Sequence, residues 1–152
     1  MDLDDRYCLF TSVISSLSYC IQNIKSMALS EFSIRGSSIN CIFHLNRSED
    51  GLTASELVEL CQEDKSAVSR SLSELENRGF VKKETNGGRV YRVKYFLTEN
   101  GKSAAARLLE VIHASVLAGG VADENERQRL YRMLTDVLKG LETYIRNQTQ
   151  LP

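Results

Sequence analysis

Apolar side chains recur every three or four residues through residues 5–28, from Phe10 to Ala28. This spacing predicts an amphipathic helix of about six turns. Residues 37–47 hold a shorter and denser apolar cluster, which predicts a second and more buried helix. The sequence Ser-Glu-Asp-Gly at 48–51 then predicts a turn.

The ends of the next two helices are marked in the sequence. Thr53 and Glu56 have the spacing of a capping box, in which each side chain bonds the backbone N–H of the other residue. This pair predicts a helix over residues 54–61. A further helix is predicted over residues 65–78, and Gly79 is suited to end it because glycine tolerates a left-handed backbone.

The period changes from helical to alternating after this glycine. Residues 80–84 and 89–97 alternate apolar and polar side chains, and Asn86-Gly87 lies between them. An Asn-Gly pair between two alternating segments is typical of a β-hairpin.

Two more helices are predicted after the hairpin. Thr98 is placed to cap the first, which ends at Gly119-Gly120. The second begins at 123–126 with Asp-Glu-Asn-Glu, another capping-box sequence. Its apolar stripe consists of Leu130, Leu134, Val137, Leu138, Leu141 and Ile145.

This order of elements predicts the fold class: mainly α, with a small α+β part. A short capped helix, a tight turn, a second helix and a hairpin form a winged helix-turn-helix. We assign residues 37–98 to this lobe, and residues 5–36 and 99–147 to N- and C-terminal dimerisation helices. Their apolar stripes are longer than so small a lobe can cover, so we expect them to pair across a twofold axis in a homodimer. The chain of 152 residues is then a single unit.

The helix predicted over residues 65–78 has two contrasting faces. At about 100° per residue, Val68, Leu72 and Leu75 form an apolar stripe. The opposite face is rich in serine, although serine is a mediocre helix former. Small hydroxyl side chains let a helix approach base edges in the major groove, where arginine pairs with guanine and asparagine with adenine. This polar face consists of Ser66, Arg70, Ser73 and Asn77, with Ser69 at its edge.

The charge distribution agrees with this interpretation, although the net charge of −1 does not by itself suggest a nucleic-acid binder. Residues 62–95 hold eight basic and five acidic residues, whereas the remainder holds 11 basic and 15 acidic residues. The basic segment therefore coincides with the serine-rich helix and the hairpin. Arginines on a thin hairpin can enter the minor groove. Lysines on its strands, such as Lys82 and Lys83, can alternatively protect a sheet edge.

We therefore predict that the chain binds double-stranded DNA. The predicted DNA-binding residues are Thr53, Ser55, Lys65, Ser66, Ser69, Arg70, Ser73, Asn77, Arg89 and Arg92. The alternative is a winged helix that binds another protein, which would have no need of arginines at the hairpin.

Residues 52–101 resemble the MarR (multiple antibiotic resistance) family of winged-helix transcriptional regulators. The specific segments are "DKSAVSRSLSELENRG" and "LTENG", whereas the flanking helices match only in length and pattern. The resemblance implies a homodimer with interlocked terminal helices, a recognition helix in the major groove, and an effector pocket where the dimerisation helices meet the DNA-binding lobe. It also implies a repressor more often than an activator.

The hairpin departs from the family pattern. The family usually has Asp-x-Arg or Asp-Arg-Arg there, whereas this chain reads "ETNGGRVYR", with glycine where the aspartate is expected. Either Arg89 or Arg92 then matches the family's arginine.

The four cysteines, at 8, 20, 41 and 61, lack the paired spacing of a zinc site, so we expect free thiols. Some peroxide-sensing members of the family use a lone cysteine near the start of the first helix, which makes Cys8 a redox-sensing candidate. Cys41 and His44 have the spacing of a metal pair, but a core cysteine and a partly buried histidine explain them as well. We predict no metal and no cofactor.

Other functional classes lack support in the sequence. There is no glycine-rich phosphate loop, nucleophile elbow or histidine–carboxylate pair at useful spacing, so we do not expect an enzyme. No apolar run has the length of a membrane span, and the acidic start "MDLDDRY" is not a secretory signal. We therefore expect a cytoplasmic protein without membrane contact.

Overall fold

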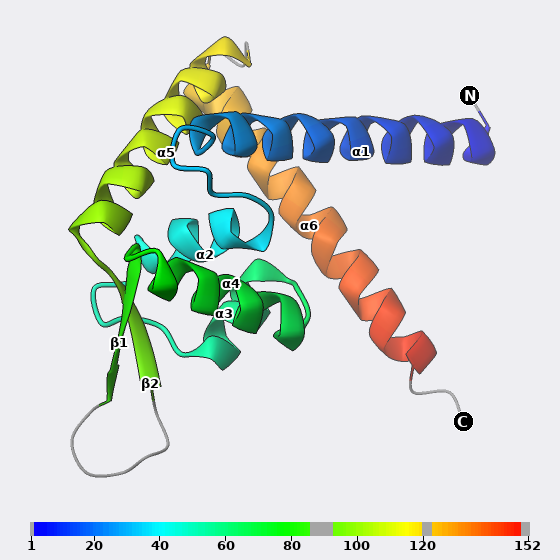
Figure 1. The fold of residues 1–152 in the computed structure, drawn as a ribbon. Coiled ribbons are helices and arrows are strands. Elements are labelled where there is room, and N and C mark those ends of the chain that lie inside the picture. The colour runs from blue at the N-terminus through cyan, green and yellow to red at the C-terminus, as the bar shows by residue number, and fades with distance from the viewer. Residues whose placement is uncertain (1, 86–92, 120–122, 150–152) are drawn as a thin grey trace. The chain divides into compact units, whose positions relative to one another are not determined.

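The computed structural model describes residues 2–85, 93–119 and 123–149. The chain divides into two compact units, residues 1–113 and 114–152. The described elements, labelled in Figure 1, are α1 (Leu3–Ala28), α2 (Ser37–Leu45), α3 (Ala54–Cys61), α4 (Lys65–Asn77), β1 (Val81–Thr85), β2 (Val93–Leu97), α5 (Glu99–Ala118) and α6 (Glu124–Thr149).

The predicted order of elements and the fold class are confirmed, and only a few ends differ. Helix α1 begins at Leu3, two residues earlier than predicted, because the Asp2 carboxylate accepts a bond of 2.8 Å from the Asp5 N–H. Helix α2 ends at Leu45 and not at residue 47, because the chain tightens there into turns. In one of these, the Arg47 N–H bonds the His44 carbonyl at 3.1 Å.

The core of the first unit lies among α2, α3, α4 and the hairpin, which pack on one another in Figure 1. Its fully buried side chains come from every one of these helices, from α5 and from the loop that joins α1 to α2. The largest are Leu29, Ile34, Ile42, Leu57, Leu72, Leu75 and Leu108. Burial of leucine and isoleucine in one contiguous cluster is the main stabilising contribution to a lobe of this size.

The hairpin is an antiparallel pair whose register runs from Val81 opposite Leu97 to Thr85 opposite Val93. Leu52 extends it, because its N–H and carbonyl bond Tyr95 at 3.1 and 2.8 Å. This second pairing, a bridge of one residue on each side, has no signal in the sequence. The predicted Asn-Gly tip lies outside the described residues.

Three predicted helix ends are confirmed. Thr53 and Glu56 form both halves of the capping box at the start of α3. Gly79 follows α4 with φ of +74°, the left-handed region that favours glycine. The Thr98 hydroxyl accepts a bond of 3.2 Å from the Gly101 N–H and so caps α5.

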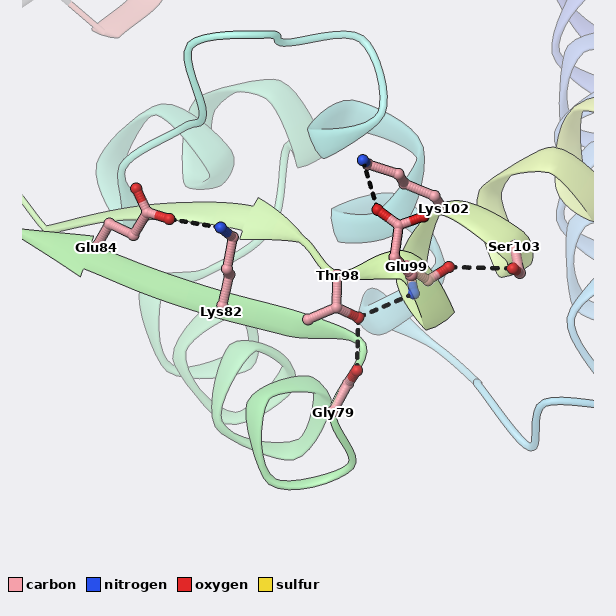
Figure 2. A network of polar contacts seen from close by, with 8 residues as sticks. Gly79, Lys82, Glu84, Thr98, Glu99, Lys102 and Ser103 are labelled. Atoms are coloured by element: carbon pink, nitrogen blue, oxygen red, sulfur yellow. Dashed lines mark hydrogen bonds and ion pairs between the residues drawn. The ribbon is translucent and has the colours of Figure 1, made fainter.

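The junction between the hairpin and α5 is held by polar bonds shown in Figure 2. The Thr98 hydroxyl also donates a bond of 2.6 Å to the Gly79 carbonyl. Gly101 packs directly against the backbone of Phe80, because a Cβ at this position would be 2.1 Å from the Phe80 carbonyl oxygen. Only glycine fits at this position, which explains one residue of the "LTENG" segment.

Helix α6 buries none of its residues. Its predicted apolar stripe is exposed along its full length, from Leu130 at 40% to Ile145 at 60%. Much of α1 shows the same feature, and its apolar side chains between Leu9 and Ile21 are exposed. No helix in the described ranges combines the length and the hydropathy that a membrane crossing requires.

Candidate nucleic-acid interface

Helix α4 has the two faces that its sequence predicts. Val68, Leu72 and Leu75 are at most 2% exposed and pack in the core. The opposite face is open to solvent. It carries the predicted residues Ser66, Ser69, Arg70, Ser73 and Asn77, all exposed. Lys65 is exposed at the start of the helix, on the side that adjoins α3. We call these six residues the outer face of α4.

The N-terminal end of α4 is fixed by polar contacts to its neighbours. The Asp64 carboxylate accepts a bond of 2.9 Å from the Ala67 N–H and caps the helix. Just before it, the Glu63 carboxylate accepts bonds from the Ser37 hydroxyl and, at 2.9 Å, from the Asn40 amide. The turn that leads into α4 is thus attached to the first turns of α2.

The C-terminal end of α4 is fixed by Arg78. Its guanidinium donates to the Ser33 carbonyl at 2.9 Å, to the Glu74 carboxylate at 3.0 Å and to the Phe32 carbonyl. It also lies over the Phe80 ring, 5.2 Å from the ring centre. Arg78 therefore orients α4, a role that the sequence analysis missed. No local sequence signal marks this role, because the two carbonyls lie 45 and 46 residues away along the chain.

Two of the predicted residues lie at the start of α3, and their side chains differ in hydrogen bonding and exposure. The Thr53 hydroxyl is occupied, since it accepts from the Glu56 N–H at 3.3 Å and donates to the Glu56 carboxylate at 2.8 Å. Ser55 is exposed. Together with Lys65 it lines a hollow of about 210 Å³ between α3 and the start of α4. Ser55 is thus adjacent to the outer face of α4, whereas the Thr53 side chain mainly caps α3.

The basic side chains near the outer face fall into two groups. Lys65 and Arg70 form no hydrogen bond or ion pair with any other residue that the structure describes. The hairpin lysines are engaged: Lys82 pairs with Glu84 at 2.6 Å (Figure 2), and Lys83 pairs with Glu76 at 3.1 Å. These pairs favour the sheet-edge interpretation of the two lysines. Arg89 and Arg92 lie outside the described residues.

Comparison with known proteins confirms the resemblance to the MarR family. Residues 34–89, from the loop before α2 to the hairpin, match the sequence model of the MarR family. The match covers the winged-helix lobe, so the similarity to the MarR family lies there. No curated protein matches the chain in sequence.

Solved structures extend the MarR-family fold to most of the chain. A MarR-family transcriptional regulator from Silicibacter pomeroyi is 20% identical, with a TM-score of 0.71 over 84% of this chain and 86% of that one. The transcriptional regulator SlyA is 20% identical, with a TM-score of 0.74 over 87% and 93%. A complex of S. aureus MepR with DNA is 19% identical, with a TM-score of 0.73 over 87% and 97%. At these identities the likeness establishes the fold.

The four cysteines differ in exposure. Cys8, the redox-sensing candidate, and Cys20 are exposed on α1, whereas Cys41 is buried and Cys61 partly exposed. No cluster of three or more potential metal ligands occurs among the described residues. His44 is half-buried, and burial lowers the pKa of its imidazole, with a further contribution from the Lys25 and Arg47 charges.

Proposed function

We propose that this chain is a sequence-specific DNA-binding transcriptional regulator. The observation that carries the proposal is the outer face of α4, where Arg70 and Lys65 form no bond with other described residues. The helix below them is fixed at both ends, by Asp64 and by Arg78. A rigid helix with small hydroxyls and unengaged cations is suited to the major groove of duplex DNA.

Two kinds of contact, to phosphates and to base edges, would contribute to DNA binding. Lys65 and Ser66, in the first turn of α4, would meet a phosphate, because the helix dipole and free N–H groups there favour an anion. Arg70 and Asn77 would read base edges, since their side chains match guanine and adenine in the major groove. Phosphate contacts supply most of the affinity, so binding should weaken steeply with salt.

We further propose that the regulator acts as a homodimer on an inverted-repeat operator. The exposed apolar stripes of α1 and α6 would be covered by a second copy of the chain. Two copies of α4 would then meet half-sites roughly 34 Å apart. The fold shared with the DNA-bound MepR structure supports the same mode of binding.

Release from DNA would come from a small-molecule or oxidant signal, and repression is the mode that the family favours. A hollow of about 400 Å³ lies between α1, α2 and the turn before α4, lined among others by Gln22, Asn40 and Glu63. Its polar walls suit a small hydrogen-bonding effector. Cys8 remains the candidate for a response to oxidants. We propose a cytoplasmic location, where the operator would lie.

The experiment that tests this function is a gel-shift with random duplex DNA at low salt, followed by selection of bound fragments from the host genome. We expect binding that weakens steeply as salt rises, and a selected site with twofold symmetry. A footprint on a single asymmetric half-site would contradict the dimeric mode. Failure to bind duplex DNA at any ionic strength would instead favour the alternative, a winged helix that binds another protein.

A further inference from the structure

Asn40, near the start of α2, joins two charged residues that are far apart in sequence. Its amide oxygen accepts a bond of 3.3 Å from the Lys25 ammonium, and its amide nitrogen donates a bond of 2.9 Å to the Glu63 carboxylate. Lys25 lies in the last turn of α1, and Glu63 lies in the turn between α3 and α4. All three residues are half-buried. A chain of polar contacts therefore runs from α1, through α2, to the residue before the N-cap of α4.

The amide of Asn40 matches both of its neighbours. An ammonium offers only donors and a carboxylate only acceptors, whereas an amide has one acceptor group and one donor group. Asn40→Asp would keep the bond from Lys25 but would set a second carboxylate against Glu63. Both bonds involve a charged partner, which makes them stronger than bonds between neutral groups. The link between α1 and the start of α4 thus depends on an amide at position 40.

The Glu63 end of this link lies where α4 begins. Glu63 precedes Asp64, whose carboxylate caps α4, and Lys65 is the first residue of the helix. The Ser37 hydroxyl donates to the second carboxylate oxygen of Glu63, so both oxygens are held by α2. Gln62 has φ of +53°, a left-handed conformation that a residue other than glycine keeps only when its surroundings hold it. The bonds to Glu63 therefore fix the turn from which α4 starts.

We propose that Asn40 is a positioning residue for DNA binding. By joining Lys25 to Glu63, it holds the first turn of α4, with Lys65 and Ser66, in the place from which that turn meets DNA. The consequence for DNA binding rests on the proposed function. Because Lys25 belongs to α1, whose exposed apolar side chains we expect a second chain to cover, the start of α4 is attached to the dimerisation helix as well as to its own lobe.

The test exchanges the amide and the carboxylate in the full chain. Asn40→Asp sets two carboxylates against each other, whereas Asn40→Asp combined with Glu63→Gln restores a carboxylate–amide pair with the roles reversed. In this double variant the side chain at position 40 accepts from Lys25 and from the amide at position 63, whose oxygen still accepts from Ser37. Glu63→Gln alone completes the comparison. Asn46→Asp, at the exposed C-cap of α2, is the control for one added charge.

Two quantities are measured for each variant: amide hydrogen exchange by mass spectrometry, and affinity for duplex DNA in a gel-shift titration. We expect Asn40→Asp to speed exchange about tenfold in peptides that cover residues 62–70 and to weaken DNA binding about tenfold, with exchange in α5 unchanged. The double variant should return both quantities to within about twofold of the wild type. Glu63→Gln, in which two amides can still pair, should lie between these results, and Asn46→Asp should change neither quantity by more than about twofold.

The outcomes separate this inference from the proposed function. Unchanged exchange at residues 62–70 in Asn40→Asp, or faster exchange that the double variant does not restore, overturns the positioning role whatever the DNA result. An equal increase of exchange in α5 also overturns it, since the change is then a general loss of stability. Faster local exchange with unchanged DNA affinity overturns the role in DNA binding.

Two further results are decided by the same data. A wild-type chain that never binds DNA refutes the proposed function, while hydrogen exchange still decides whether Asn40 holds the turn before α4. If Asn40→Asp does not fold, the double variant decides the question. A folded double variant with wild-type exchange supports the link, and a double variant that also fails to fold overturns it.

Discussion

Helices α4 and α6 are both amphipathic, but they expose opposite faces. Helix α4 buries Val68, Leu72 and Leu75 and presents serines and an arginine to solvent. Helix α6 buries nothing and leaves Leu134 and Leu138 exposed at 37% and 51%. The fold of α4 is thus complete within one chain, and its polar face is available for a ligand. No residue of α6 is buried among the described ranges, so we expect the partner of its apolar face to be another chain.

This contrast underlies both proposals, DNA binding by α4 and dimerisation through α6. A serine-rich face is costly for a helix and needs a reason beyond solvation. An exposed leucine stripe of several turns exceeds what a monomeric protein usually leaves uncovered. The differences between α4 and α6 can be tested by substitutions placed on matched faces of the two helices.

The largest effect is expected from charges on the apolar stripe of α6. Leu134→Asp combined with Leu138→Asp should convert dimers to monomers, because carboxylates cannot be buried there without a partner. DNA affinity should fall by about 100-fold or more, since each half-site would be bound separately. Sedimentation equilibrium and gel-shift titration measure the two effects. Thr143→Asp, which adds one carboxylate on the opposite side of α6, should change neither, and a dimeric double variant would refute the role of the stripe.

The next effect concerns the buried face of α4. Leu72→Ala should lower the free energy of unfolding by about 2–5 kcal/mol, because it leaves a cavity in the core. Urea unfolding followed by circular dichroism measures this change. Ser73→Ala, one residue away on the outer face of α4, should stay within about 0.5 kcal/mol of the wild type. Equal losses for the two variants would mean that both faces are packed.

Much of this contrast could be predicted from sequence, because it depends on local patterns. The apolar stripe of α4, its end at Gly79 and the capping box at Thr53 each follow from residues within a few positions of one another. The same holds for the exposed stripe of α6, whose period is visible in the sequence alone.

The contacts that orient α4 could not be predicted. Arg78 bonds the Phe32 and Ser33 carbonyls across more than forty residues of chain, and Glu63 bonds Asn40 across 23. Such pairs arise only when helices pack, and they have no period or motif in the sequence.

A moderate effect is expected from the capping box of α3. Thr53→Ala should cost about 0.5–2 kcal/mol of stability, because the Glu56 N–H loses its acceptor. Thr53→Ser keeps the hydroxyl and should restore most of the loss in urea unfolding. If Thr53→Ser and Thr53→Ala are equally unstable, the hydroxyl is not the capping group.

The smallest effect is expected for single lysines in salt titrations of DNA binding. Lys65→Ala should reduce the slope of log affinity against log salt by about one, as for the loss of one phosphate contact. Lys83→Ala should leave the slope nearly unchanged, because Lys83 is paired with Glu76. A larger change of the slope for Lys83→Ala than for Lys65→Ala would mean that Lys83, and not Lys65, contacts a phosphate.

The most direct test of the central claim is the base preference of Arg70→Ala. Binding sites are selected from random duplexes with the wild type and the variant, and urea unfolding verifies that both are equally stable. If the outer face of α4 reads the major groove, the variant loses about 1–3 kcal/mol of binding free energy, and its preference relaxes at one position of each half-site. An unchanged preference at every position would contradict the claim that this face reads DNA.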